Sequence, residues 1–257
     1  MIKAIFFDVD GTLVSFKTHK VAQSTIEALN ELKKKGIKIF VASERHKVSI
    51  NNLGDLQFDG YVCLNGSICF VADDVIYKHC MPKEDSQNLL HYVQKVEQYP
   101  CAFVYENELL MNFKNEVTDK IFTMLNFPEP PIADLNEHKD REVFQAIAFL
   151  NEEEEKRMLE VLPGCAATRW NPYCADIIPK GGSKWIGIKK VLEHFGIKQE
   201  ETMAFGDGGN DIDMLQNAHI GIAMGNAKDD VKVHADYVTA SVDEDGIMKA
   251  LKHFGVL

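Results

Sequence analysis

Apolar runs at the start of the chain alternate between the periodicity of a strand and that of a helix. Residues 4–7, Ala-Ile-Phe-Phe, are continuously apolar and end at Asp8, as a short buried strand does. Residues 21–35 place apolar side chains at helical spacing and finish with three lysines before Gly36, which is a helix stop signal. The alternation continues with a strand predicted at 37–42, a helix at 46–53 and a strand at 60–64. Strands joined by helices through short links predict a parallel sheet covered by helices.

The last third of the chain repeats this alternation, whereas the middle differs. Helices are predicted at 183–194, 212–218 and 245–254, and strands at 202–206, 220–223 and 237–239. In the middle, longer helices at 84–97 and 152–162 are interspersed with runs rich in β-forming residues at 102–105, 109–113, 143–150 and 175–178. We therefore predict an α/β protein whose core domain combines residues 1–80 and 181–257, interrupted by an inserted α+β domain of residues 81–180.

Composition and charge narrow the class of protein. The chain has 257 residues, of which 46% are hydrophobic and 26% charged, as is ordinary for a globular protein. Its net charge of −11 argues against binding to nucleic acid or to an anionic membrane surface, because both favour basic patches. No run approaches the ~20 apolar residues that span a bilayer, and the N-terminus has no signal-peptide pattern. We expect a cytoplasmic protein, a monomer or weak homo-oligomer, whose six cysteines are reduced.

A pair of carboxylates follows the first predicted strand. Asp8 and Asp10 lie in the sequence Asp-Val-Asp-Gly-Thr, at the carboxyl end of a parallel strand, where ligands bind to open α/β sheets. One carboxylate can attack a substrate while the other exchanges a proton with the leaving group. A calcium loop is the alternative, but it needs further oxygen ligands and a glutamate at fixed spacing, and apolar residues follow here instead.

A second acidic cluster, Gly-Asp-Gly-Gly-Asn-Asp at 206–211, follows another predicted strand. Asp207 and Asp211 can complete, together with Asp8, a hard-oxygen site suited to Mg²⁺. Alone, this segment is as consistent with a turn as with a functional site. Two such clusters at strand ends indicate function, since carboxylates gathered without a metal would repel one another.

A phosphate group would also need positive charge and hydrogen-bond donors. Ser43, at the end of the strand at 37–42, offers a hydroxyl and a backbone N–H, and Lys184 offers an ammonium group at a helix start. Taken singly, Ser43 is more simply a helix cap and Lys184 a surface lysine. The Gly-Gly-Ser-Lys segment at 181–184 lacks the spacing of a nucleotide P-loop, which excludes that kind of site.

Together these segments resemble, in order, the four motifs of the haloacid dehalogenase superfamily. The motifs are Asp8-x-Asp10-Gly11-Thr12, Ser43, Lys184 and Gly206-Asp207-x-x-Asn210-Asp211. The mid-chain insertion, the form of the last motif and Asn65-Gly66 resemble the Cof-type sugar-phosphatase branch. The resemblance implies a Rossmann-like parallel-sheet core with an inserted cap of type IIB, and an Mg²⁺-dependent phosphatase acting on a small phosphorylated metabolite. Sugar phosphates are the default expectation, with pyridoxal phosphate or flavin mononucleotide as competitors.

The resemblance also implies a role for each matching position. Asp8 would form an aspartyl-phosphate, and Asp10 would protonate the leaving oxygen and then activate water. Phosphoryl oxygens would be held by Ser43 and by the backbone N–H groups of Val9 and Glu44. Lys184 would neutralise charge, and Asn210 would orient Lys184 or the phosphate. Mg²⁺ would be held by Asp8, the Asp10 carbonyl and Asp207, with Asp211 beside it or acting through water.

Two positions depart from the family pattern. The second motif usually reads Thr-Gly-Arg and here reads Ser43-Glu44-Arg45, so that a carboxylate could disfavour acidic substrates or bind sugar hydroxyls. Arg45 could reach the substrate or pair with a helix terminus. Trp185 stands where glycine is common and is expected to pack under its helix. Candidate polar residues of the inserted domain that could line a substrate are Glu106, Asn112, Arg169, Asn171 and Asp176.

Two alternatives to a phosphatase stay open. A phosphomutase would use the same aspartyl-phosphate, with a sugar hydroxyl instead of water as acceptor. A non-catalytic phosphosugar sensor would keep the fold, although it would not need both Asp8 and Asp10.

Overall fold

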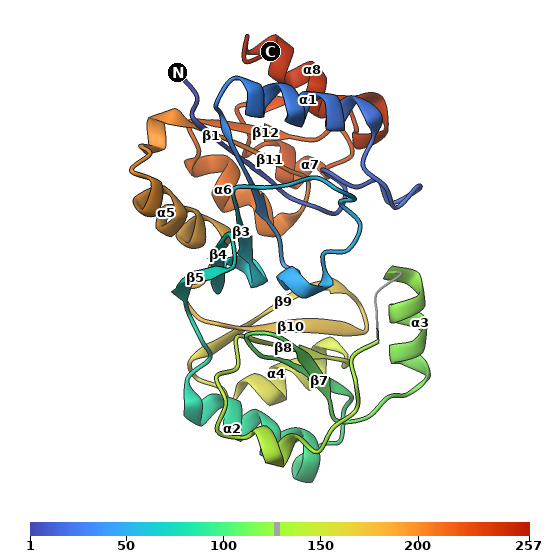
Figure 1. Cartoon of the computed structure of the whole chain (residues 1–257). Coiled ribbons are helices and arrows are strands. Elements are labelled where there is room, and N and C mark those ends of the chain that lie inside the picture. The colour runs from blue at the N-terminus through green and yellow to red at the C-terminus, as the bar shows by residue number, and fades with distance from the viewer. Residues whose placement is uncertain (126–128) are drawn as a thin grey trace. The chain divides into compact units, whose positions relative to one another are not determined.

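The computed structural model describes residues 1–125 and 129–257, which separate into two compact units. Unit 1 comprises Met1–Tyr77 and Ser183–Leu257, and unit 2 comprises Lys78–Gly182 (Figure 1). Each unit has its own sheet and its own hydrophobic clusters. In the described ranges, no helix combines the length and the apolar character needed to cross a membrane.

Unit 1 is built on an eight-stranded sheet in the order β13-β12-β11-β1-β2-β3-β4-β5. Its strands are β1 (Ala4–Phe7), β2 (Lys38–Ala42), β3 (Gly60–Cys63), β4 (Ile68–Val71), β5 (Asp74–Lys78), β11 (Thr202–Gly206), β12 (Ile220–Ala223) and β13 (Tyr237–Val238). Neighbours from β13 to β3 pair in parallel, and β4 runs antiparallel to β3. The predicted α/β fold with a parallel core sheet is confirmed.

Helices cover both faces of this sheet because alternate residues of its strands point to opposite sides. Ile5 and Phe7 of β1 pack in one cluster with apolar residues of α1 (Gln23–Lys34) and α8 (Gly246–His253). Ala4 and Phe6 pack in another with α5 (Lys184–Phe195) and α6 (Ile212–Asn217). Trp185 lies in this second cluster, buried as predicted. The short helix α7 (Asp229–Lys232) also contributes a residue to it.

Two local predictions for unit 1 differ from the structure. The helix expected at 46–53 is only a 3₁₀ turn, Lys47–Ser49, whose start is capped by the His46 ring nitrogen accepting from the Val48 N–H. The strands β4 and β5 were not predicted at all. β4 arises because Leu64, Asn65 and Gly66 adopt positive φ angles of 51°, 52° and 88°, which turn the chain back along β3, and Ala72, at a φ of 53°, lies in the turn between β4 and β5.

Unit 2 is a five-stranded antiparallel sheet in the order β7-β6-β8-β10-β9. Its elements are α2 (Lys83–His91), a π-helical turn (Tyr92–Val96), β6 (Cys101–Val104), β7 (Leu109–Met111), α3 (Glu116–Leu125), β8 (Gln145–Ala148), α4 (Glu152–Leu159), β9 (Cys165–Asn171) and β10 (Cys174–Pro179). Ala146, Ala148 and Ile177 of the sheet pack with Leu89 of α2 and Met158 of α4. The predicted α+β character of the middle segment is thereby confirmed.

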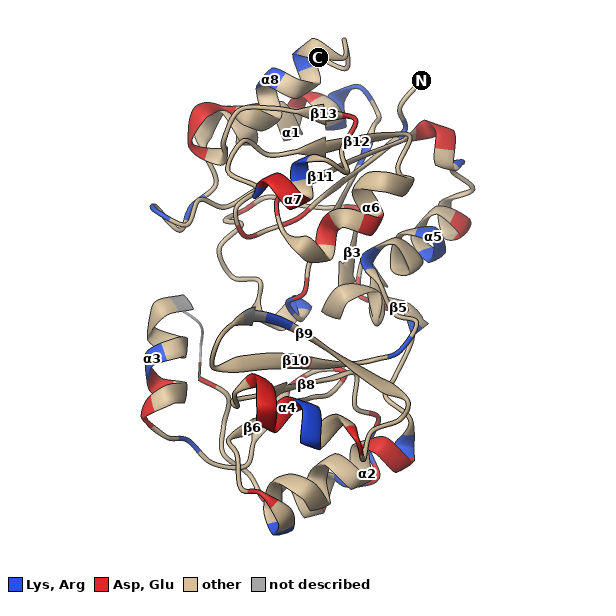
Figure 2. Cartoon of the chain, turned by 180° about the vertical axis from the view of Figure 1, so that it is seen from behind, with Lys and Arg blue, Asp and Glu red and all other residues tan. Residues whose placement is uncertain are grey.

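Acidic residues are concentrated in the first turns of particular helices. In the view of Figure 2, acidic residues colour the first turn of α4 and much of α7, while Lys and Arg are distributed over separate elements. This distribution fits the net charge of −11.

Candidate active site

The carboxyl ends of neighbouring strands bring the sequence motifs together at one edge of the unit 1 sheet. Phe7, the last residue of β1, pairs with Val41 of β2 on one side and with Phe205 of β11 on the other. The loops that begin at Asp8, Ser43 and Asp207 therefore leave the sheet side by side. Gly11 turns the first loop at a φ of 86°, where an added Cβ would lie 2.2 Å from the Asp207 carboxylate.

Lys184 lies at the centre of this edge and is fully buried. Its Nζ donates to Asp8 Oδ1 and to Asp211 Oδ1, at 2.6 Å in both cases. Burial lowers the pKa of Lys184, but the carboxylates of Asp211 and Asp8 outweigh it and the pKa is raised overall. The interpretation of Lys184 as a surface lysine is therefore wrong. Ser183 caps α5 by accepting from the Ile186 N–H. This cap fixes the start of the helix, whose first residue is Lys184.

Three carboxylates gather beside this lysine. Asp8, Asp207 and Asp211 each offer an oxygen, and these oxygens lie within 4.8 Å of one another. Burial raises the pKa of Asp207 to about 7, and the Asp211 charge adds to the effect. Burial likewise raises the pKa of Asp8 well above its usual range, against the opposing charge of Lys184. The cluster thus holds more negative charge than its one lysine compensates, which is consistent with a metal site.

Asp211 also organises its own loop. Its Oδ2 accepts from the backbone N–H groups of Asp207 and Gly208, at 2.9 and 2.8 Å, while Oδ1 accepts from Lys184. Asp211 therefore holds the loop and the lysine in place. Asp8 and Asp207 are the more accessible of the three carboxylates.

Asp10 is not part of the carboxylate cluster but forms an ion pair with Arg45. Arg45 Nε lies 2.7 Å from Asp10 Oδ2, and Nη2 donates to Oδ1 at 2.9 Å. The two side chains are 11% and 21% exposed, and this two-point contact fixes the orientation of the carboxylate. Arg45 thus contacts another loop of the same edge.

Ser43 and Glu44 begin the loop after β2. Ser43 is buried, its backbone N–H donates to Val62 O in the sheet, and its hydroxyl accepts from the Arg45 N–H. No α-helix follows it, so the helix-cap interpretation is wrong. The Glu44 carboxylate accepts from Asn210 Nδ2 at 3.2 Å, and the same nitrogen donates to Asn65 Oδ1 at 3.1 Å. Burial raises the pKa of Glu44, with Lys184 opposing the effect and Asp10 and Asp211 adding to it.

Two residues that sequence reasoning missed hold Asp207 in place. Thr12 Oγ1 donates to Asp207 Oδ1 at 2.9 Å, and Asn226 Nδ2 donates to Asp207 Oδ2 at 3.1 Å. Asn226 also donates to Gly11 O and accepts from the Val242 N–H, so it ties three loops together. Thr12 lies inside a quoted motif. Asn226 follows the end of β12 by three residues, and its position at a strand end was the available signal.

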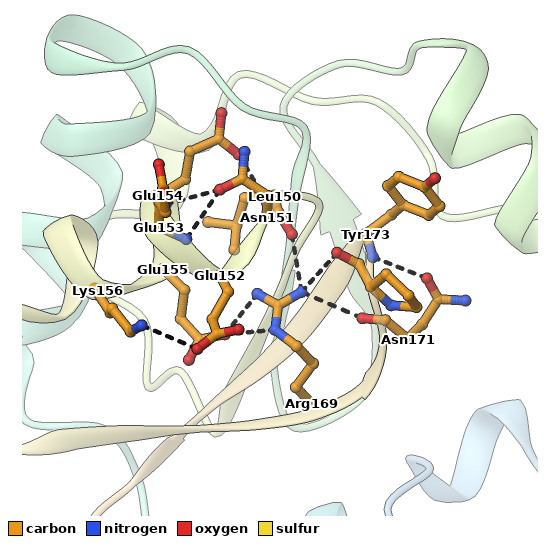
Figure 3. A network of polar contacts seen from close by, with 11 residues as sticks. Leu150, Asn151, Glu152, Glu153, Glu154, Glu155, Lys156, Arg169, Asn171 and Tyr173 are labelled. Carbon is orange, nitrogen blue, oxygen red and sulfur yellow. Dashed lines mark hydrogen bonds and ion pairs between the residues drawn. The ribbon is translucent and has the colours of Figure 1, made fainter.

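The five candidate residues of unit 2 have contacts within that unit. Every guanidinium nitrogen of Arg169 is used: Nε and Nη2 donate to Glu155, and Nη1 donates to the carbonyls of Leu150, Asn171 and Pro172 (Figure 3). Asn112 bridges backbone groups of Cys101 and Tyr99. Glu106 pairs with Lys78, Asn171 caps a turn at Tyr173, and Asp176 is buried on β10. Arg169 and Asn112 therefore have structural partners that account for them.

Comparison with known proteins identifies the family of this chain. Residues 5–251 match the family of haloacid dehalogenase-like hydrolases. The chain belongs to this family. It is 35% identical over 261 residues to the putative phosphatase YkrA of Bacillus subtilis. The alignment covers 99% of this chain and 98% of YkrA.

Solved structures place the haloacid dehalogenase-like chain in one branch of the family. It superposes on a structure described as the subclass IIB sugar phosphatase BT4131 with a TM-score of 0.91 and 50% identity, over 99% of this chain and 100% of the other. The phosphatase BT1666 of Bacteroides thetaiotaomicron gives a TM-score of 0.91 at 39% identity, over 100% and 96%. The chain is thus a phosphatase of the Cof-type branch, subclass IIB, and a hydrolase.

Proposed function

We propose that this phosphatase hydrolyses small phosphorylated metabolites, sugar phosphates first among them, with Mg²⁺ as cofactor and Asp8 as covalent nucleophile. The observation that carries the proposal is the buried ammonium of Lys184, hydrogen-bonded to Asp8 within a cluster of three carboxylates. Such a lysine favours the ionised form of Asp8 against the effect of burial, and adds positive charge where a phosphoryl group would approach. The likeness to sugar phosphatase BT4131 supports the substrate class.

In the first step, a carboxylate oxygen of Asp8 attacks phosphorus and the bond from phosphorus to the leaving oxygen breaks. Asp10, in the protonated form that this step requires, gives its proton to that oxygen, so the metabolite leaves as an alcohol and Asp8 carries an aspartyl-phosphate. Arg45 aims the Asp10 carboxyl through its two-point contact. The Ser43 hydroxyl and the N–H groups of Val9 and Glu44 hold the phosphoryl oxygens, while Asn210 fixes the loop beside them.

In the second step, water attacks phosphorus and Asp10 accepts its proton. The bond between Asp8 and phosphorus breaks, which releases inorganic phosphate and restores the carboxylate. Lys184 neutralises charge on Asp8 and on the phosphoryl group in both steps.

The carboxylate cluster fits a divalent cation. Mg²⁺ prefers carboxylate oxygens and retained waters, and a cation here would offset the burial and the mutual repulsion that raise the pKa values of Asp8 and Asp207. Asp8, Asp207 and the carbonyl of Asp10 would hold it, with Asp211 beside it. When bound, Mg²⁺ supplies positive charge to the phosphoryl oxygens.

The position of the proposed site residues indicates a different role for each unit. All of the proposed catalytic and metal-binding residues belong to unit 1. We propose residues 1–80 and 181–257 as the catalytic core and residues 81–180 as the cap that selects the metabolite.

The decisive experiment replaces the nucleophile. Asp8→Asn should abolish Mg²⁺-dependent hydrolysis of p-nitrophenyl phosphate while the protein stays folded, because an amide does not attack phosphorus. Asp73→Asn is the matched control, since the Asp73 side chain is fully exposed in the same unit. Undiminished turnover by Asp8→Asn would overturn the mechanism. A panel of phosphorylated metabolites, compared by kcat/KM, then ranks sugar phosphates against other esters, and uniformly negligible values would favour a phosphosugar sensor.

A further inference from the structure

The carboxylate of Glu44 is a fifth acidic group at this sheet edge. It accepts from Asn210 Nδ2, and the same nitrogen donates to Asn65 Oδ1. Asn65 is buried, and its backbone N–H donates to Ser43 O, so the chain of contacts returns to the loop that carries Glu44. The charge of Glu44 is therefore fixed at the sheet edge and does not swing freely into solvent.

Carboxylates already outnumber basic side chains at this sheet edge. Asp8, Asp10, Asp207 and Asp211 already supply four carboxylates against Lys184 and Arg45. Asp10, Asp211, Lys184 and Arg45 are the charged groups that act most on Glu44. Like charges brought together at a binding site cost affinity, and such a cost distinguishes one ligand from another.

We infer that Glu44 makes this phosphatase selective for esters whose leaving group is uncharged, by repelling leaving groups that carry a second negative charge. The inference rests on the proposed function and deepens it. It names the substrate class as phosphorylated polyols and neutral sugars, in preference to phosphorylated sugar acids and bisphosphates. The competing role for this carboxylate is to attract sugar hydroxyls. In that case, removing the charge would lower kcat/KM for neutral substrates, whereas repulsion predicts no such loss.

Two ester pairs isolate the charge of the leaving group. 3-Phosphoglycerate has a carboxylate where glycerol 3-phosphate has a hydroxymethyl group. 6-Phosphogluconate differs from glucitol 6-phosphate in the same way. We expect Glu44→Gln to raise kcat/KM for 3-phosphoglycerate about tenfold relative to glycerol 3-phosphate, equivalent to ~1.4 kcal/mol. The change should be smaller for the six-carbon pair, whose carboxylate lies farther from the phosphorus.

Three controls accompany this measurement. Glu44→Asp keeps the charge and should keep the selectivity. Glu193→Gln makes the same change of net charge at an exposed position of α5 and should leave the ratio unchanged. Inhibition by inorganic phosphate reports repulsion of the phosphoryl group itself, so it separates that effect from repulsion of the leaving group.

Two results of these measurements would overturn the inference. A ratio that stays within twofold in Glu44→Gln overturns the inference, and so does a fall in kcat/KM for the neutral esters with none for the anionic ones. Binding of the same esters to Asp8→Asn with and without Glu44→Gln, measured by calorimetry, gives the ratio without turnover. If the wild-type chain hydrolyses none of the esters, the proposed function fails, while the calorimetric ratio still decides the role of Glu44.

Discussion

At the scale of single residues, the site depends on one buried lysine between two carboxylates. Lys184 and Asp211 are fully buried, and Asp8 is almost so. A charge taken out of water is tolerated only when it is paired and hydrogen-bonded, and here each carboxylate accepts at 2.6 Å. The same contacts stabilise the fold and set the charge of the proposed nucleophile.

Lys184→Met should therefore impair both stability and activity. Removing one partner of a buried ion pair costs about 3–5 kcal/mol of unfolding free energy, since the remaining carboxylates stay buried without compensation. We expect turnover of p-nitrophenyl phosphate to fall by at least about 100-fold, because charge stabilisation of this kind is worth that much. Urea unfolding and steady-state kinetics measure the two effects. Lys189→Met, at an exposed position of the same helix, is the control. Wild-type turnover in Lys184→Met would contradict the assigned role.

At the scale of elements, close approaches of backbone place the functional loops. Gly187 of α5 lies so near the turn after β3 that an added Cβ would meet Gly66 Cα at 2.9 Å and Val62 Cγ1 at 2.6 Å. Gly66, at a φ of 88°, would in turn contact Ser183 O. The start of α5, and with it Lys184, is thus seated directly on the turn that contains Asn65. In unit 2, Arg169 performs the comparable task by joining β9 to α4 and to the carbonyls around it (Figure 3).

Arg169→Ala should consequently act on stability first. The substitution leaves Glu155 and three carbonyls without their donor, and we expect a loss of about 1–3 kcal/mol in the unfolding free energy of unit 2. In the surviving folded protein, kcat for p-nitrophenyl phosphate should change by less than about twofold. Circular dichroism melts and the same assay test this. Arg157→Ala, which removes a solvent-screened surface pair with Glu97, is the matched control and should cost much less stability than Arg169→Ala. A large fall in kcat with unchanged stability would instead assign Arg169 to catalysis.

At the scale of the whole molecule, two units with separate cores respond differently to a metal ion. The carboxylate cluster belongs to unit 1 alone. A ligand that binds only the folded state stabilises it by an amount that grows with the logarithm of its concentration. Mg²⁺ should therefore raise the unfolding temperature of unit 1.

This stabilisation should increase with pH. The pKa of Asp207 in the folded protein is about 7, far above the value of about 4 expected in the unfolded chain. Between these values the folded protein retains a proton, and stability without metal falls as pH rises through 7. Mg²⁺ must displace that proton, so it binds more tightly at pH 8 than at pH 6. Differential scanning calorimetry with and without Mg²⁺ at both pH values measures the difference. An equal shift at both would show that Asp207 does not bind the ion.

The order of strands and helices and the presence of a functional edge were readable in the sequence, because both depend on local patterns. Continuous apolar runs marked the central strands, and Asp8 and Asp207 directly follow two of them. The reversal from β3 to β4 was not predicted, although Asn65-Gly66 is a turn signal, because the turn also needs a positive φ angle at Leu64, a residue that does not favour one.

What the sequence determined by itself is therefore the α/β class, the family and the identity of the acidic motifs, all of which are written in short segments. Tertiary structure alone decided which side chains meet. It buried Lys184, paired Arg45 with Asp10, brought Asn226 to Asp207 and fixed Glu44 beside Asn210. Such contacts join residues far apart in the chain, and only the register of the parallel strands places their loops at a common edge.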